Sequence, residues 1–333
     1  MLAARTAPVL AQATAPATER EAALTVTVVP RSESGAFRDT TLVYVDGQID
    51  AGSPDRLSKA LDRINGRTAI WLNSAGGNLF AGMQLGRIIR RHGASTNIID
   101  ARTLLPGQCY SACSLAFLGG VYRFGDNGAR YGVHSASLGP AGEDADRASD
   151  LSAAVGSYIR EMGVDVRLLE LWTKARPDQM YVLSQKQAED LGVVNNGRRP
   201  PEWGVASGGS RLQGRQVTVD GTGTVSFSCD GKQTVLSSAY DAAGPGEHRD
   251  SRGGSYWLTI DGSDAAALTS RRATDGEDLR PRFALPADLV RRARLARQIG
   301  LRSPSISYGV DIDDRSAPMV QRFLGNCLRG QVK

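Results

Sequence analysis

The chain has 333 residues, of which 41% are apolar and 23% charged, so it is long enough to bury a globular core in one large or two ordinary domains. The formal net charge is +5, from 40 basic and 35 acidic residues. No basic stripe is interleaved with aromatic residues, and no apolar run approaches the ~18–20 residues of a membrane span. The sequence therefore predicts no nucleic-acid partner and no stable membrane span.

Residues 1–38 are predicted to form an N-terminal arm or the remnant of a signal peptide. Leu10-Ala11-Gln12-Ala13 follows a short apolar piece and has the small-x-small pattern of a signal-peptidase site. We therefore expect a periplasmic or secreted protein. The alternative is a cytoplasmic protein that carries a disordered arm rich in Ala, Pro and Thr. Residues 23–30 of the arm contain one candidate strand.

A β/α rhythm runs from residue 39 to residue 200 and predicts an α/β domain. The expected elements, in chain order, are a strand at 40–50, a helix at 53–64, a strand at 67–74, a helix at 79–93, a strand at 95–101, a helix at 112–120, a strand at 130–136, helical structure over 144–173, and a turn, a helix and a final short strand over 180–194. Ser53 is expected to cap the first helix, with Pro54 in its first turn, and Gly93 to close the second helix.

Residues 201–333 differ in character and predict a smaller α+β domain. Apolar and polar residues alternate between Asp-Gly turns, which indicates hairpins. Helices are expected at roughly 286–299 and 316–329. Such a domain could cap an active site, recognise a substrate, mediate assembly, or simply bury an edge of the first domain. No internal repeat is present.

Cys109 and Cys113 lie close together in the stretch PGQCYSACSLAFLGG, residues 106–120. A zinc site needs about four ligands, and this stretch offers two, so no metal site is predicted. A disulfide between them is awkward within one helix, but becomes feasible if Cys109 lies in the turn before it. Two buried thiols are the competing interpretation.

Ser111 stands between these two cysteines, after a Pro-Gly turn and before an apolar helix. At such a corner, the free amides of the helix start favour the negative charge of an acyl-transfer intermediate. A hydroxyl needs a base, and His134 lies on the next predicted strand. Taken alone, Ser111 would be an ordinary helix cap and His134 a core histidine.

A glycine pair supplies a third feature. In LNSAGGNLFAG, Gly76 and Gly77 follow an apolar strand and precede a helix. A backbone without side chains can approach a substrate and direct its N–H groups into a site. A tight strand-to-helix turn would use the same residues. The three features together, each after a predicted strand, favour a catalytic site.

The stretches WLNSAGGNLFAGMQLGRIIRRHG, LPGQCYSACSLAFLGGVYRFGDNGARYGVHS and PDQMYVLSQKQAEDLGVV resemble the Clp-protease proteolytic subunit and its crotonase-fold relatives, over roughly residues 40–196. The likeness is greatest to a bacterial branch predicted to be periplasmic. It implies a ClpP/crotonase-like ββα spiral domain over 39–200, followed by the α+β domain.

The resemblance also implies roles for individual residues. Ser111 would be the nucleophile and His134 the general base, with the backbone amides of Gly77 and Ala112 as the oxyanion hole. The third member would be Asp178, with Asp165 as an alternative.

The expected activity is therefore that of a serine peptidase acting on a peptide or protein substrate, with no cofactor, in a homo-oligomer. The chain has Ala75 where the family often has proline, and it lacks the family's long ordered arms, so a barrel fed by an ATPase is not expected. A non-catalytic binding protein and another acyl hydrolase on the same fold remain the alternatives. Cys229 and Cys327 could form a second disulfide if the protein is exported, and in a reducing compartment they would be two unrelated thiols.

Overall fold

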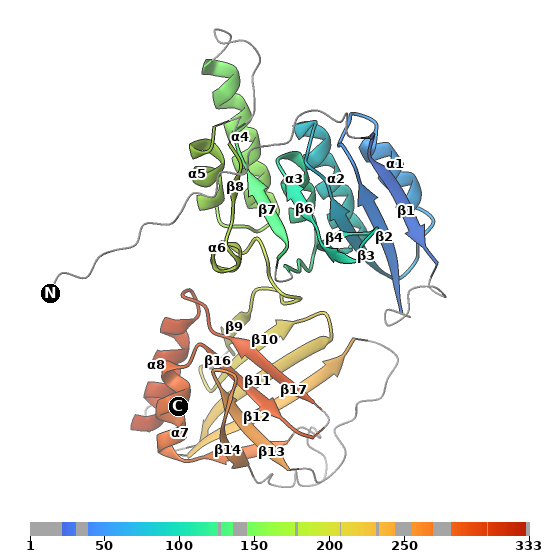
Figure 1. The fold of residues 1–333 in the computed structure, drawn as a ribbon. Helices are drawn as coiled ribbons and strands as arrows, with labels where there is room; N and C mark the ends of the chain where they lie inside the picture. Colours follow the sequence, from blue (N-terminus) through green and yellow to red (C-terminus); the bar gives the residue numbers. More distant parts are fainter. Residues whose placement is uncertain are drawn as a thin grey trace, which may run out of the picture. The chain divides into compact units, whose positions relative to one another are not determined.

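The computed structural model describes residues 22–30, 39–125, 128–135, 145–176, 179–206, 208–230, 233–243, 255–268, 281–304 and 306–330. Along the chain, the internal contacts divide it into two compact units, with the division between Gly197 and Arg198. The units combine helices with several sheets, which confirms the predicted α/β class (Figure 1). None of the helices within these ranges is long and apolar enough to cross a membrane.

The first unit is built on a five-stranded sheet in the order β1-β2-β3-β4-β5. Its strands are β1 (Thr25–Val29), β2 (Thr40–Asp46), β3 (Arg67–Asn73), β4 (Ser95–Asp100) and β5 (Leu105–Pro106). The three inner strands are parallel, and each outer strand pairs antiparallel with its neighbour. The strand expected within residues 23–30 is confirmed as β1.

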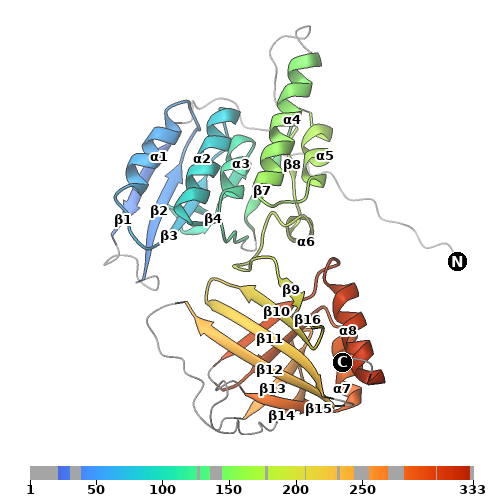
Figure 2. The same cartoon turned by 180° about the vertical axis from the view of Figure 1, so that it is seen from behind.

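Three helices pack side by side on one face of this sheet, as Figure 2 shows: α1 (Ser53–Leu61), α2 (Leu79–His92) and α3 (Ala112–Leu118). The α2 helix begins at Asn78, whose side chain accepts a hydrogen bond from the Ala81 N–H, and ends at Gly93 with φ 73°, as predicted. The cap of α1 is Gly52, so the prediction of Ser53 was wrong. Ser53 is instead the first helical residue, and its hydroxyl accepts a hydrogen bond from the Asp50 N–H.

A smaller sheet joins β6 (Gln108–Tyr110), β7 (Arg130–Val133) and β8 (Tyr181–Val182). Strands β6 and β7 are parallel, with Tyr110 opposite Gly132. A bridge between Ser74 and Cys109 connects β6 to the end of β3. Because parallel strands end at the same edge, the residues that follow β6 and β7 become neighbours.

The remaining helices of this unit are α4 (Ala145–Glu161), α5 (Arg167–Lys174) and α6 (Gln185–Asp190). The helical stretch predicted over 144–173 is two helices, separated at Gly163, which has φ 67°. The short strand predicted at the end of 180–194 is absent from this described part of the chain. Val193 is buried there in a loop, and its carbonyl oxygen accepts a hydrogen bond from Arg123.

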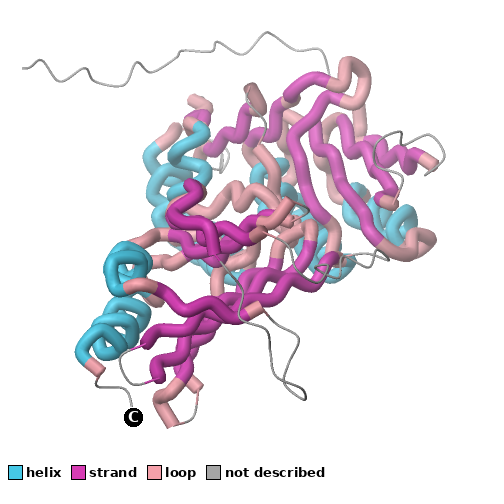
Figure 3. Tube along the Cα trace, turned by 90° about the horizontal axis from the view of Figure 1, so that it is seen from below, coloured by secondary structure: helices cyan, strands magenta, loops and turns pink. Residues whose placement is uncertain are grey.

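The second unit consists of a five-stranded sheet, a four-stranded sheet and two helices. The strands are β9 (Glu202–Val205), β10 (Arg211–Val217), β11 (Gly221–Asp230), β12 (Gln233–Ala242), β13 (Tyr256–Ile260), β14 (Ser263–Leu268), β15 (Arg282–Leu285), β16 (Gln298–Arg302) and β17 (Ser307–Asp311). The helices α7 (Ala287–Leu295) and α8 (Ala317–Arg329) lie side by side, in the part of the trace that ends at the label C in Figure 3.

The hairpins predicted here are confirmed, since β10, β11 and β12 pair antiparallel in sequence order. The helix expected at 286–299 ends at Leu295, because Gln298–Arg302 forms a strand that pairs with both β13 and β17. The α8 helix agrees with the prediction over 316–329.

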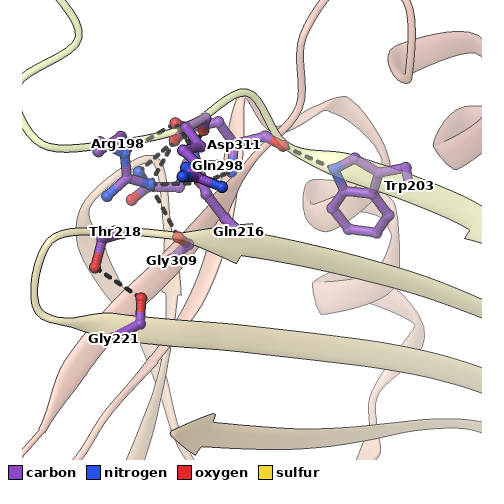
Figure 4. Close-up of polar contacts among 9 residues, drawn as sticks. Arg198, Trp203, Gln216, Thr218, Gly221, Gln298, Gly309 and Asp311 are labelled. Atoms are coloured by element: carbon purple, nitrogen blue, oxygen red, sulfur yellow. Dashed lines mark hydrogen bonds and ion pairs between the residues drawn. The ribbon is translucent and has the colours of Figure 1, made fainter. Parts of the chain in front are cut away.

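A polar cluster holds the first residues of the second unit against its sheets (Figure 4). Arg198 donates to both carboxylate oxygens of Asp311 at 3.0 Å, and Gln216 and Gln298 each donate to the same carboxylate at 2.7 Å. Burial opposes the charge on Asp311, but these hydrogen bonds outweigh it and hold its pKa below the ordinary 3.8. The Trp203 indole N–H donates to the Asp311 carbonyl oxygen.

Candidate active site

Ser111 occupies the corner between strand β6 and helix α3. Its backbone has φ 55° and ψ −121°, a conformation that residues other than glycine rarely adopt. Holding a side chain in such a region costs on the order of 1–3 kcal/mol, and such residues cluster at functional sites. The Ser111 side chain forms no capping hydrogen bond with the helix that follows. Ser111 is therefore not the ordinary helix cap that local propensity would suggest.

Backbone contacts fix this corner from both sides. The Ser111 N–H donates to the Gly132 carbonyl oxygen at 3.0 Å, which ties it to β7. The Ser111 carbonyl oxygen accepts from the Ser114 N–H at 3.0 Å and from the Ser114 hydroxyl at 2.6 Å. Ser114 is fully buried, and nothing in its position three residues after Ser111 singled it out in the sequence.

The Gly76-Gly77 turn lies directly against Ser111. A Cβ atom on Gly76 would be 2.7 Å from the Ser111 Cβ and 3.2 Å from the Ala112 nitrogen, and one on Gly77 would overlap the Ile49 carbonyl oxygen. Both glycines have positive φ, 111° and 134°. The turn is anchored by the Ser74 hydroxyl, which accepts from the Gly76 N–H at 3.1 Å. Glycine is required here both for its conformation and for the close approach.

The backbone N–H groups of Gly77, in the turn, and of Ala112, the first residue of α3, have no acceptor among the residues that the structure describes. The N–H groups on either side of Gly77 are both occupied, because Gly76 donates to Ser74 and Asn78 donates to Ile49. Uncommitted N–H groups beside a serine hydroxyl are the groups that could accept an oxyanion.

His134 directly follows β7. Its Nδ1 atom is buried and has no hydrogen-bond partner within the described ranges. Burial lowers the pKa of the imidazole below its ordinary 6.5, against a smaller opposing effect of the Ser135 backbone. A histidine that is neutral at neutral pH can accept a proton.

Ser111 and His134 are brought to the same edge of the small sheet. Ser111 is hydrogen-bonded to Gly132, two residues before His134. No hydrogen bond joins the Ser111 hydroxyl to the imidazole in the described part of the molecule. In free enzymes such contacts are often long and shorten only when substrate binds.

Asp178 lies outside the described residues. One described residue on each side of it contacts the His134 segment: the Ala175 carbonyl oxygen accepts from the Ser135 N–H at 2.8 Å, and Tyr181 pairs with Val133. Asp165, the alternative acid, is engaged elsewhere, since Arg167 donates to its carboxylate and lowers its pKa.

Both predicted cysteine pairs lie at disulfide distance. Cys109 is on strand β6 and Cys113 in helix α3, with Cα atoms 5.1 Å apart, so the bridge links strand to helix across the corner. Cys229 on β11 and Cys327 on α8 have Cα atoms 5.5 Å apart. Paired cysteines are typical of proteins in an oxidising environment. The described residues contain no group of three or more side chains suited to a metal ion.

Comparison with known proteins finds similarity among solved structures. No protein-family model matches the chain, and no curated protein matches it. Among solved structures, ClpP1 from Listeria monocytogenes is similar at 23% sequence identity and a TM-score of 0.37, covering 47% of this chain and 89% of that chain. Likeness of this degree carries no conclusion about chemistry.

Proposed function

We propose that the protein is a serine hydrolase with Ser111 as its nucleophile. The observation that carries the proposal is the strained Ser111 corner, packed against Gly76 and flanked by two uncommitted backbone N–H groups. A structural serine needs neither the strain nor the adjacent donors. A nucleophile that forms a tetrahedral intermediate needs an exposed corner and an oxyanion site beside it.

In the proposed mechanism, His134 takes the hydroxyl proton as the Ser111 oxygen attacks a carbonyl carbon. The carbonyl oxygen becomes an oxyanion that the Gly77 and Ala112 N–H groups stabilise. Collapse of this intermediate expels the leaving group, which takes the proton from His134, and leaves an acyl group on Ser111. Water then attacks the acyl group with the same assistance, and the free enzyme returns.

The lowered pKa of His134 supports its role as base, because the imidazole is then neutral at neutral pH. Its Nδ1 has no partner among the described residues, and a catalytic imidazole needs an acceptor there that orients the ring. We assign this role to Asp178, because Ala175 and Tyr181 both contact the His134 segment.

We further propose a peptide or protein as substrate, because the motifs in residues 40–196 resemble the Clp-protease subunit. The same resemblance favours a ClpP/crotonase-like first domain and a homo-oligomer. The two cysteine pairs favour a periplasmic or secreted location. The proposed chemistry uses protein groups and water alone.

A non-catalytic binding protein is the second candidate. The observation that favours it is the missing hydrogen bond between Ser111 and His134 in the described structure, since a decayed site keeps its fold without its contacts.

Labelling with a fluorophosphonate probe separates the two candidates. We expect the wild type to be labelled at Ser111 and Ser111→Ala to be unlabelled. We expect His134→Ala to react at least about a hundredfold more slowly than the wild type, because a general base contributes about 10²–10⁴ in rate. His92→Ala is the matched control, since the His92 Nε2 contacts only the Thr68 hydroxyl on the described chain. A folded wild type that resists labelling would favour the binding protein.

A further inference from the structure

The Cys109–Cys113 bridge encloses the candidate nucleophile. It links strand β6 to the first turn of α3 and spans Tyr110, Ser111 and Ala112. These three residues include both the strained serine and one of the two uncommitted N–H groups. The other bridge, Cys229–Cys327, lies in the second unit.

The enclosed segment has little room to move. Gly76 packs on Ser111, and a Cβ on Gly82 would overlap the Ala112 carbonyl oxygen, so both sides of the corner are closely packed. A small rotation at Ser111 would move its hydroxyl relative to the Gly77 and Ala112 N–H groups. Misplacement of reacting groups by about 1 Å can cost about a hundredfold in rate.

Opening the bridge would remove a covalent constraint on Ser111, whose backbone conformation is unfavourable. Ser111 is a non-glycine residue at φ 55°, and it relaxes toward ordinary φ values when nothing opposes the change. Without the bridge, the corner is held by noncovalent contacts: the hydrogen bonds to Gly132 and Ser114 and the packing of Gly76 and Gly82.

We propose that the Cys109–Cys113 disulfide makes the reactivity of Ser111 dependent on oxidation, so that the site is competent only in the oxidised protein. This inference rests on the proposed serine chemistry. A dithiol opens the bridge when one of its thiolates attacks a cysteine sulfur and forms a mixed disulfide. Its second thiolate then attacks the mixed disulfide, and the dithiol leaves as a cyclic disulfide. In total, two electrons and two protons pass to the cysteines. Oxidised glutathione reverses the change and releases two reduced glutathiones.

The test measures the rate of fluorophosphonate labelling in three forms of the full chain. Cys229→Ser/Cys327→Ser removes only the bridge of the second unit and is the matched control. Cys109→Ser/Cys113→Ser removes only the bridge around the serine. We expect the control to react at the wild-type rate and the second variant to react about a hundredfold more slowly.

A reversible experiment keeps the test independent of how the variant folds. The control variant, which holds only the Cys109–Cys113 bridge, is treated with dithiothreitol, and its free thiols are counted by alkylation and mass spectrometry. Because both sulfur-bearing side chains are fully buried, opening is expected to be slow. The labelling rate should fall in proportion to the opened fraction and return after oxidation by glutathione disulfide.

Equal labelling of the opened and closed forms would overturn the inference while leaving the serine hydrolase intact. An unlabelled oxidised wild type would instead contradict the proposed function itself, and the inference with it. A loss of labelling that oxidation does not restore would mean damage to the fold, and would also overturn the inference.

Discussion

Ser111 is held in an unfavourable backbone conformation by its neighbours rather than by its own preference. The Gly132 carbonyl oxygen accepts from its N–H, and Ser114 donates twice to its carbonyl oxygen. These contacts keep the hydroxyl at the corner instead of letting it cap α3. Strain of this kind is tolerated where the surrounding structure over-determines it.

At the same scale, the environment of His134 predicts how reactivity depends on pH. Burial lowers its pKa below 6.5, so the neutral, proton-accepting form persists to more acidic pH. The rate of fluorophosphonate labelling should therefore rise with pH and reach half of its maximum below pH 6.5. The measurement is the labelling rate from pH 4 to pH 9, about the range in which a histidine and its neighbours titrate. A midpoint above that of a free histidine would contradict the assignment.

The stability of the folded protein should fall with decreasing pH, as the reactivity does. Because the folded protein binds the His134 proton less readily than the unfolded chain, this residue contributes stability that is present at neutral pH and lost as the pH falls below 6.5.

Gly76 offers a second test at the residue scale. In Gly76→Ala, the new methyl group would meet the Ser111 Cβ and the Tyr110 carbonyl oxygen, each at 2.7 Å, so the corner must shift. We expect labelling to fall about a hundredfold. Gly93→Ala is the matched control, because it also places alanine at positive φ but has open space around it. It should lose about 1–2 kcal/mol of stability and keep the wild-type labelling rate.

At the scale of elements, helix α3 is anchored at the end opposite to Ser111. The buried guanidinium of Arg123 donates to the carbonyl oxygens of Gly120, Gly192 and Val193, each at 2.8 Å. The guanidinium has no carboxylate partner among the described residues. Burial, and to a smaller extent repulsion from Arg90, lowers its pKa to about 10. The residue thus ties the end of α3 to the loop after α6.

Arg123→Lys should therefore destabilise the first unit although it keeps the charge. A single ammonium cannot reproduce three directed hydrogen bonds, and each buried carbonyl left without a donor costs about 1–3 kcal/mol. We expect a loss of about 2 kcal/mol or more in the free energy of unfolding, measured by denaturant titration. Arg91→Lys, at an exposed position of α2, should be neutral. Equal stability of the two variants would show that the buried contacts contribute little.

At the scale of the whole molecule, the chain consists of two units with separate cores. The second unit begins at Arg198, which is bound to Asp311, near the other end of that unit's sequence. Gln216 and Gln298 complete the shell of this carboxylate. The Asp311 carboxylate on β17 thus connects strands β10 and β16 and the first residue of the unit by hydrogen bonds.

Asp311→Asn should loosen the second unit. The substitution removes the charge that Arg198, Gln216 and Gln298 share, and a third of the side chain is exposed, so we expect a loss of about 2 kcal/mol. The matched control is Asp264→Asn, which breaks the exposed pair with Arg302 and should cost less stability, because solvent-exposed ion pairs contribute little. Calorimetry of the full chain is the measurement. If Asp311→Asn unfolded no earlier than the control, the cluster would have no stabilising role.

Local patterns in the sequence were enough to predict most elements of the first unit. Alternating and helical periodicities located β2, β3, β4, α1 and α2, and Gly93 marked the end of α2, because each signal acts within a few residues of its effect. The order of Gly77, Ser111 and His134 after successive strands also indicated one site. In the second unit, the strand Gln298–Arg302 was missed, because pairing with β13 and β17 overrode a helical pattern.

The sequence by itself determined the residue types and their order: a glycine pair, a serine between two cysteines, and a histidine one strand later. Only the tertiary structure decided that Gly76 packs on Ser111, that Ser111 takes a positive φ, and that the N–H groups of Gly77 and Ala112 have no acceptor on the described chain. It also decided that Cys109 lies on a strand and Cys113 in a helix, which makes their bridge feasible. The reason is physical, since these features arise from contacts between segments far apart in the chain, which no local propensity encodes.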